Sequence, residues 1–148
     1  MTDPTSAQVY RVNIKATPQQ VWDAITQPER SKQYFHGAAI DVTAHSYSTH
    51  GPDGSDWGSG SVFEFAPPHR LVHAWSSGYS PELAAEPPSR VTWEIEDRGN
   101  GVTMVTVTHD RLEHSPKTAE SVFGKGWSYV VSSLKTYLET GTGLPRVG

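Results

Sequence analysis

Apolar and polar residues alternate along the first regular segment of the chain. Between Gln8 and Lys15 one face carries Tyr10, Val12 and Ile14, while the positions between them are mostly polar. A period of two is typical of a half-buried β-strand. The pattern therefore predicts an opening strand over residues 8–15.

A helix is predicted directly after this strand. Thr17 stands at an N-cap position before a proline, and Gln20 follows at the spacing of a capping box. Pro28 either ends this helix or starts a second short helix that runs through Tyr34 and Phe35. The apolar stripe of the first helix consists of Val21, Trp22 and Ile25.

Short alternating runs separated by turn signals fill the middle of the chain. Strands are predicted over 61–65, 70–76 and 102–109, and a further strand lies between the last two. The segment 78–89 holds three prolines and is too long for a minimal hairpin loop, so we expect a mobile rim of a site there. The residues expected on the inner strand faces are Leu71, His73, Trp75, Val91, Trp93, Ile95, Val105, Val107 and His109.

Apolar residues at helical spacing predict a long helix over residues 118–140. Its stripe consists of Phe123, Trp127, Val130, Val131, Leu134 and Leu138. Gly124 and Gly126 either weaken its first turn or allow a close approach to the sheet. Gly141 stands at the C-cap position, and the tail from Leu144 is expected to fray.

The order of strand, helix pair, strand meander and long helix is typical of the α+β class. In this class the helices pack on one face of an antiparallel sheet. The length of the chain suits a single core. We therefore expect one domain over residues 1–148, with its core at about 8–141 and frayed termini.

Composition narrows the class of protein. The net charge is −4 and no segment concentrates basic residues, so nucleic acid is not expected as a partner. Cysteine is absent, and no stretch reaches the ~18 apolar residues of a membrane span, so a cytoplasmic protein without a membrane span is expected. Five Trp, six Tyr and four Phe can fill a core or line a pocket.

Five segments, taken in order, carry a likeness to a known family: Ala16–Thr26, Tyr34–Phe35, Pro67–Trp75, Val105–His109 and Gly126–Gly141. They resemble the activator of heat-shock protein 90 ATPase homologues, within the START-like superfamily of lipid-transfer and polyketide-cyclase proteins. The resemblance implies a helix-grip fold, in which a curved antiparallel sheet wraps around a long C-terminal helix over a central cavity. Residues 43–60 depart from the family pattern, because they are polar where an aromatic-rich strand is expected.

The tryptophans are the leading candidates for the lining of such a cavity. Their strand and helix periods direct them to one interior, with indole N–H groups available to orient a ligand. The alternative is a solid aromatic core. Tyr34 and Phe35 either form a cavity mouth or make an ordinary packing contact. The cavity candidates are Trp75, Trp93, Trp127, His73, His109, Tyr34, Phe35 and Val131.

His73 and His109 are predicted on apolar strand faces, where an imidazole needs a polar partner. Each could move a proton on a ligand or serve as a satisfied structural histidine. His45 and His50 lack the accompanying ligands of a metal site, and no dinucleotide or phosphate-binding motif is present. Neither a metal nor a cofactor is expected.

Three functions follow from these observations. The leading interpretation is a binding module for a small hydrophobic or amphipathic molecule that enters between segment 78–89 and the C-terminal helix. The alternative is an enzyme of the cyclase or hydratase kind that uses His73 or His109. A co-chaperone role follows only from the family resemblance. A homodimer is one of the assemblies that the sequence leaves open.

Overall fold

A computed structural model describes residues 3–147 of the 148-residue chain. Met1, Thr2 and Gly148, at the termini predicted to fray, lie outside the described residues. The elements, in order, are β1 (Gln8–Lys15), α1 (Pro18–Thr26), α2 (Pro28–Ser31), β2 (Ala39–Val42), β3 (Ser46–His50), β4 (Asp56–Ala66), β5 (Arg70–Trp75), α3 (Pro81–Ala84), β6 (Ser89–Gly99), β7 (Val102–Asp110), α4 (Pro116–Val122) and α5 (Lys125–Thr140).

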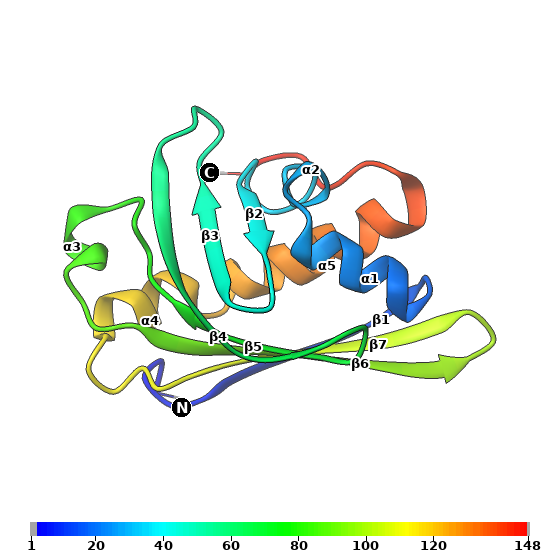
Figure 1. Cartoon of the computed structure of the whole chain (residues 1–148), viewed down its shortest axis with the longest axis horizontal. Helices are drawn as coiled ribbons and strands as arrows, with labels where there is room; N and C mark the ends of the chain where they lie inside the picture. Colours follow the sequence, from blue (N-terminus) through cyan, green and yellow to red (C-terminus); the bar gives the residue numbers. More distant parts are fainter. Residues whose placement is uncertain (1–2, 148) are drawn as a thin grey trace.

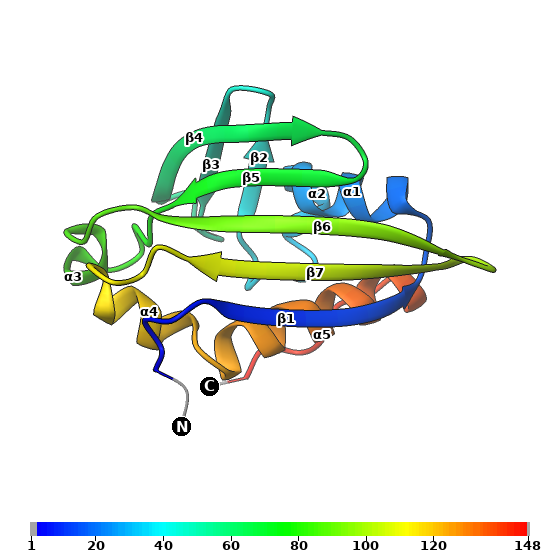
Figure 2. The same ribbon diagram turned by 90° about the horizontal axis from the view of Figure 1, so that it is seen from below.

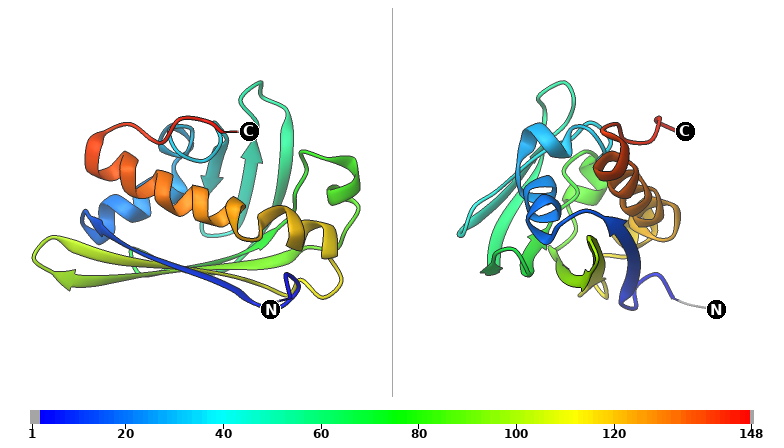
Figure 3. Two further views of the ribbon diagram at one scale, coloured as in Figure 1. Left: turned by 180° about the vertical axis from the view of Figure 1, so that it is seen from behind. Right: turned by 90° about the vertical axis from the view of Figure 1, so that its right-hand side faces the viewer.

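The strands of the described residues form one seven-stranded sheet. Its order is β1-β7-β6-β5-β4-β3-β2, and every neighbouring pair is antiparallel. Figure 2 shows β4, β5, β6, β7 and β1 side by side, with the helices on the far face. The sheet curls so that α5 lies within its concave face (Figures 1 and 3). This arrangement confirms the predicted α+β class.

The register brings the predicted inner-face residues together. Leu71 of β5 pairs with Trp93 of β6, and Trp93 pairs with Val107 of β7. Directly paired residues point to the same face of a sheet, and all three are buried. Glu94 points the other way and is exposed. The period-2 pattern therefore identified the buried face correctly.

The predicted capping box starts α1. The Gln20 backbone N–H donates to Thr17 Oγ1 at 3.1 Å, and the Thr17 N–H donates to Gln20 Oε1 at 2.8 Å. The second helix is shorter than predicted, because α2 ends at Ser31 and a turn follows. His36 and Gly37 both take a positive φ, of 54° and 75°, which is incompatible with a helix.

The predicted long C-terminal helix is interrupted. Helix α4 ends at Val122, and Gly124, with φ of 61°, precedes α5. A Cβ atom on Gly126 would lie 3.0 Å from the Ser121 carbonyl oxygen, so the close approach that this glycine allows is to α4. The break turns Phe123 outward, where it is 37% exposed, while Trp127, Val130, Val131 and Leu134 remain buried.

Residues 43–60 contain strand structure although most of them are polar. Strand β3 and the first half of β4 lie here, and Tyr47 of β3 is buried while the serines beside it are not. The strand predicted over 61–65 therefore begins earlier, at Asp56. An inward residue at every second position is enough for a strand with one solvated face.

Segment 78–89, predicted as a mobile loop, contains α3 and is tied to α4. Glu86 accepts hydrogen bonds from the backbone N–H groups of Lys117 at 3.0 Å and Thr118 at 2.7 Å. Ser115 Oγ donates to the Pro87 carbonyl oxygen at 2.7 Å.

Among residues 3–147, each helix is too short or too polar to cross a lipid bilayer.

Candidate ligand-binding cavity

A cavity of about 630 Å³ lies where α4 and α5 face the β3–β4 turn and the segment after β5. The exposure of Tyr79 and Val147 at its edge, 44% and 76%, places its mouth at the surface. Its lining residues are Phe35, His36, Pro52, Trp57, Trp75, Tyr79, Ser121, Val122, Gly126, Trp127, Val130, Arg146 and Val147.

The buried wall of the cavity is aromatic. The ring centroids of Trp75 and Trp127 are 5.6 Å apart, and Phe35 lies 6.1 Å from the first and 6.2 Å from the second. Both indole N–H groups are already bonded, Trp75 Nε1 to Ser77 Oγ at 2.9 Å and Trp127 Nε1 to His109 Nδ1 at 3.0 Å. The indoles therefore present only their ring surfaces to a ligand. The free N–H donors predicted from the sequence are not available.

One side of the mouth is formed by Tyr79, from the segment after β5. Its ring meets Trp57 at 5.6 Å in an edge-on contact. Its hydroxyl lies 2.7 Å from Ser121 Oγ of α4, within hydrogen-bond distance. This pair spans the predicted entrance between segment 78–89 and the C-terminal helices.

The other side of the mouth is formed by the C-terminal tail. The Tyr129 hydroxyl donates to the carbonyl oxygens of Leu144 at 3.1 Å and Pro145 at 3.0 Å. The Leu144 N–H donates to Ser133 Oγ at 3.0 Å. The tail predicted to fray is thus held against α5 as far as Pro145, and it brings Arg146 to the cavity.

His109 lies behind Trp127 and does not line the cavity. Because an indole N–H can only donate, His109 Nδ1 must accept, so Nε2 carries the proton and donates to Ser89 Oγ at 2.7 Å. Burial, and secondly the charge of His73, lower the pKa of His109 to about 3. The ring is therefore neutral near neutral pH, with both nitrogens bonded to protein groups.

His73 is also neutral and lies outside the cavity lining. Its ring stacks on Tyr47 at 4.1 Å, and its Nδ1 donates to the Ala74 carbonyl oxygen at 2.9 Å. Burial lowers the pKa of His73 to about 4. The arrangement is that of a packed core side chain.

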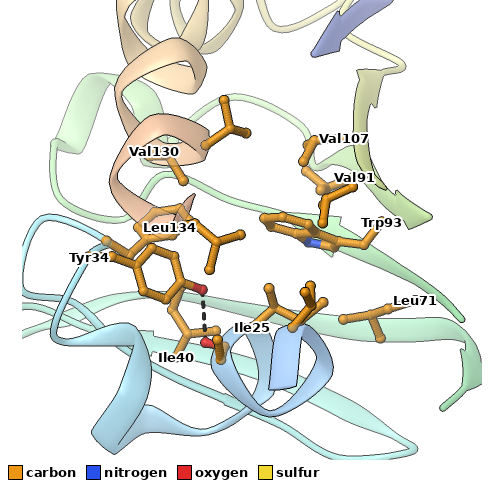
Figure 4. Packing of buried hydrophobic residues seen from close by; sticks show 14 of the residues in the cluster. Ile25, Tyr34, Ile40, Leu71, Val91, Trp93, Val107, Val130 and Leu134 are labelled. Atoms are coloured by element: carbon orange, nitrogen blue, oxygen red, sulfur yellow. Dashed lines mark hydrogen bonds between the residues drawn. The ribbon is translucent and has the colours of Figure 1, made fainter. Parts of the chain in front are cut away.

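Three further candidates, Trp93, Tyr34 and Val131, belong to the buried core and do not line this cavity. Figure 4 shows Trp93 and Tyr34 among the buried hydrophobic residues. The ring centroids of Trp93 and Trp127 are 5.8 Å apart, and Trp93 packs among aliphatic residues. The Tyr34 hydroxyl donates to the Ala24 carbonyl oxygen at 2.8 Å. Val131 is buried beside Val130, the helix residue that does line the cavity.

Of the predicted candidates, Phe35, Trp75 and Trp127 line the cavity, and the ten other lining residues were not predicted. Those with aromatic or charged side chains among the ten are His36, Trp57, Tyr79 and Arg146. Tyr79 lies in the segment predicted as a rim. Trp57 follows Gly51-Pro52-Asp53-Gly54, a sequence typical of a turn, so both positions left a signal in the sequence. Arg146 left no such signal, because its place depends on the path of the tail.

Within residues 3–147, no three His, Cys, Asp or Glu side chains gather as metal ligands.

Comparisons with known proteins agree on the fold. A sequence model of the family described as "Activator of Hsp90 ATPase homolog 1-like protein" matches residues 15–139. CalU16 from Micromonospora echinospora is 22% identical, with a TM-score of 0.69 over 91% of this chain and 77% of that chain. DynU16, from the dynemicin biosynthetic locus, is 26% identical, with a TM-score of 0.70 over 93% of this chain and 49% of that chain, so this chain spans about half of its length.

Aha1 from Colwellia psychrerythraea, whose solution structure is a dimer, is 19% identical. Its TM-score is 0.68 over 93% of this chain and 98% of that chain. No protein of curated function matches the sequence significantly. The matches confirm the predicted helix-grip, START-like fold.

Proposed function

The chain belongs to the family of activator of Hsp90 ATPase homolog 1-like proteins, and from this premise we propose that it binds a small hydrophobic or amphipathic molecule in the cavity. The observation that carries the proposal is the cavity of about 630 Å³ with an aromatic wall. Sites for small molecules enclose ~300–1,000 Å³ and are mostly apolar.

The aromatic wall supplies the energy of binding. A ligand that covers Phe35, Trp75 and Trp127 removes apolar surface from water on both sides of the contact. Each Å² removed contributes about 25 cal/mol, before the losses of ligand freedom are subtracted. Flat aromatic and fatty compounds are therefore the expected binders.

The state of His73 and His109 argues against proton transfer by either of these two residues. A general acid or base must reach the ligand through a free nitrogen. Both nitrogens of His109 are engaged by Trp127 and Ser89, and His73 packs on Tyr47 away from the cavity. A cyclase or hydratase reaction would have to use other groups, and a co-chaperone role rests on the family name alone.

The test is a titration with flat aromatic and fatty compounds, followed by calorimetry and tryptophan fluorescence. Trp75→Leu, which opens the cavity wall, should weaken the best binder about tenfold or more. Trp93→Leu is the matched control, because it removes an equally buried indole that does not line the cavity.

Thermal melting should verify that both variants are folded at the temperature of the titration. If no compound binds saturably to the unchanged protein, the proposal fails. It also fails if folded Trp93→Leu loses as much affinity as Trp75→Leu.

A further inference from the structure

A second, smaller cavity adjoins the apolar one. Its volume is about 90 Å³, several times the ~10–15 Å³ that one water needs, so it has room for a carboxylate group. The two cavities share His36 and Arg146, which places them next to each other. The residues that line the smaller cavity are Lys32, Gln33, Tyr34, His36, Gly37, Tyr129, Leu144 and Arg146.

The small cavity carries positive charge. Lys32 and Arg146 both line it, and neither cavity has an acidic residue among its described lining residues. Lys32 Nζ lies 3.4 Å from Glu29 Oε1, but both side chains are exposed, at 47% and 84%, and such contacts are weak. In the part of the chain that the structure describes, Arg146 has no carboxylate within ion-pair distance.

The backbone places the Arg146 guanidinium. Tyr129 and Ser133 hold the tail just before it. Gly37 has a positive φ and no side chain, and a Cβ atom there would collide with Arg146 Nη2. The guanidinium therefore lies against the Gly37 backbone, where Arg146 borders both cavities.

We propose that the ligand is an amphipathic acid, with its apolar body against the aromatic wall and its carboxylate between Arg146 and Lys32. This proposal rests on the proposed function and names the class of ligand. A guanidinium can bind a carboxylate through two parallel N–H···O bonds, which a neutral end group does not reproduce. Partial burial, and secondly the charge of Arg146, lower the pKa of His36, which lines both cavities.

The experiment compares three ligands of equal chain length, dodecanoate, 1-dodecanol and dodecylamine, below the concentrations at which they self-associate. Calorimetry at neutral pH should show dodecanoate binding about tenfold tighter than the alcohol, with the amine weakest. Added salt should weaken dodecanoate and leave the alcohol almost unchanged.

Arg146→Gln should reduce the affinity for dodecanoate to that for the alcohol and leave alcohol binding unchanged. Lys32→Gln should have a smaller effect, because Lys32 already faces Glu29. Arg98→Gln is the matched control, since Arg98 is an exposed arginine that lines neither cavity.

Equal binding of acid and alcohol to the unchanged protein overturns the acid proposal and leaves the binding function standing, and this comparison needs no variant. Equal weakening of acid and alcohol by Arg146→Gln also overturns it. If none of the three ligands binds saturably, the acid proposal is overturned. If the flat aromatic compounds do not bind either, the proposed binding function is overturned as well.

Discussion

The interior of the molecule has two ends that are packed differently. Around Trp93 the space is filled, with Ile25 of α1 and Leu134 of α5 facing Val107 of the sheet (Figure 4). Around Trp75 the space is open, and the same sheet and the same helix enclose a cavity of about 630 Å³.

The difference lies in what faces the sheet. At the filled end α1 and α5 both supply branched aliphatic side chains. At the open end α5 presents Gly126 and Val130 beside Trp127, and α4 presents Ser121 and Val122, and apart from Trp127 these side chains are small. The contrast suggests that stability is concentrated at one end and binding at the other, so that each can be changed with little effect on the other.

The largest expected effect is a truncation at the filled end. Leu134 is fully buried there, so Leu134→Ala should lower the free energy of unfolding by about 2–5 kcal/mol, measured by urea denaturation. Ligand affinity of the folded variant should not change. Ser132→Ala, at an exposed position of α5, is the control. A loss below about 0.5 kcal/mol would contradict the assignment of Leu134 to the core.

The buried histidines should make stability depend on pH. The pKa of His109 is lowered to about 3 and that of His73 to about 4, both chiefly by burial. An unfolded chain titrates these residues near ~6.5, so it binds more protons below that pH, and the free energy of unfolding should fall by a few kcal/mol between about pH 6.5 and pH 3. Above pH 7 this contribution is fully present.

Urea denaturation across this pH range measures the effect. His109→Gln, which cannot titrate, should flatten the curve, whereas His114→Gln at an exposed position should leave its slope unchanged. An unchanged slope in His109→Gln would mean that folding does not lower the pKa of His109.

Adding volume at each end compares the two ends directly. Val107→Phe overfills a closed site and should cost about 1–3 kcal/mol of stability. Val130→Phe can extend its ring into the cavity, so it should change stability by less than about 1 kcal/mol while it blocks ligand binding. Equal destabilisation by the two substitutions would mean that the open end is closed in solution.

The smallest effect is expected at the cavity mouth. Tyr79→Phe removes the contact with Ser121 Oγ and leaves the ring in place. Since one neutral hydrogen bond contributes about 1 kcal/mol, ligand dissociation should accelerate by about fivefold at most, with almost no change in melting temperature. Stopped-flow fluorescence measures the rate. A slower dissociation would argue against a restraining role for this pair.

Most of the fold could be predicted because its signals are local. The capping box at Thr17, the alternation of β1 and the stripe through Leu134 each depend on near neighbours in the sequence. Strand β3 gives a weaker signal because its outward residues are polar. The break between α4 and α5 escaped prediction because a glycine in the sequence does not reveal its φ.

The cavity was less accessible to prediction. Periodicity gives the face on which a residue lies, but the end of the interior at which it lies depends on the facing element. Trp75 and Trp93 lie on equivalent faces of adjacent strands. For this reason Trp75 lines the cavity, whereas Trp93 lies in the filled core. Arg146 depends on the path of the tail, which no local pattern describes.

The tryptophans connect the two ends in another sense. The centroids of Trp75 and Trp127 are 5.6 Å apart, and those of Trp127 and Trp93 are 5.8 Å apart. At such separations the transition dipoles of neighbouring indoles couple, so an excitation is shared along the row. A chromophore bound beside Trp75 should therefore alter the near-ultraviolet circular dichroism and quench emission from Trp93 as well. The tryptophan fluorescence therefore reports on the open end and the filled end together.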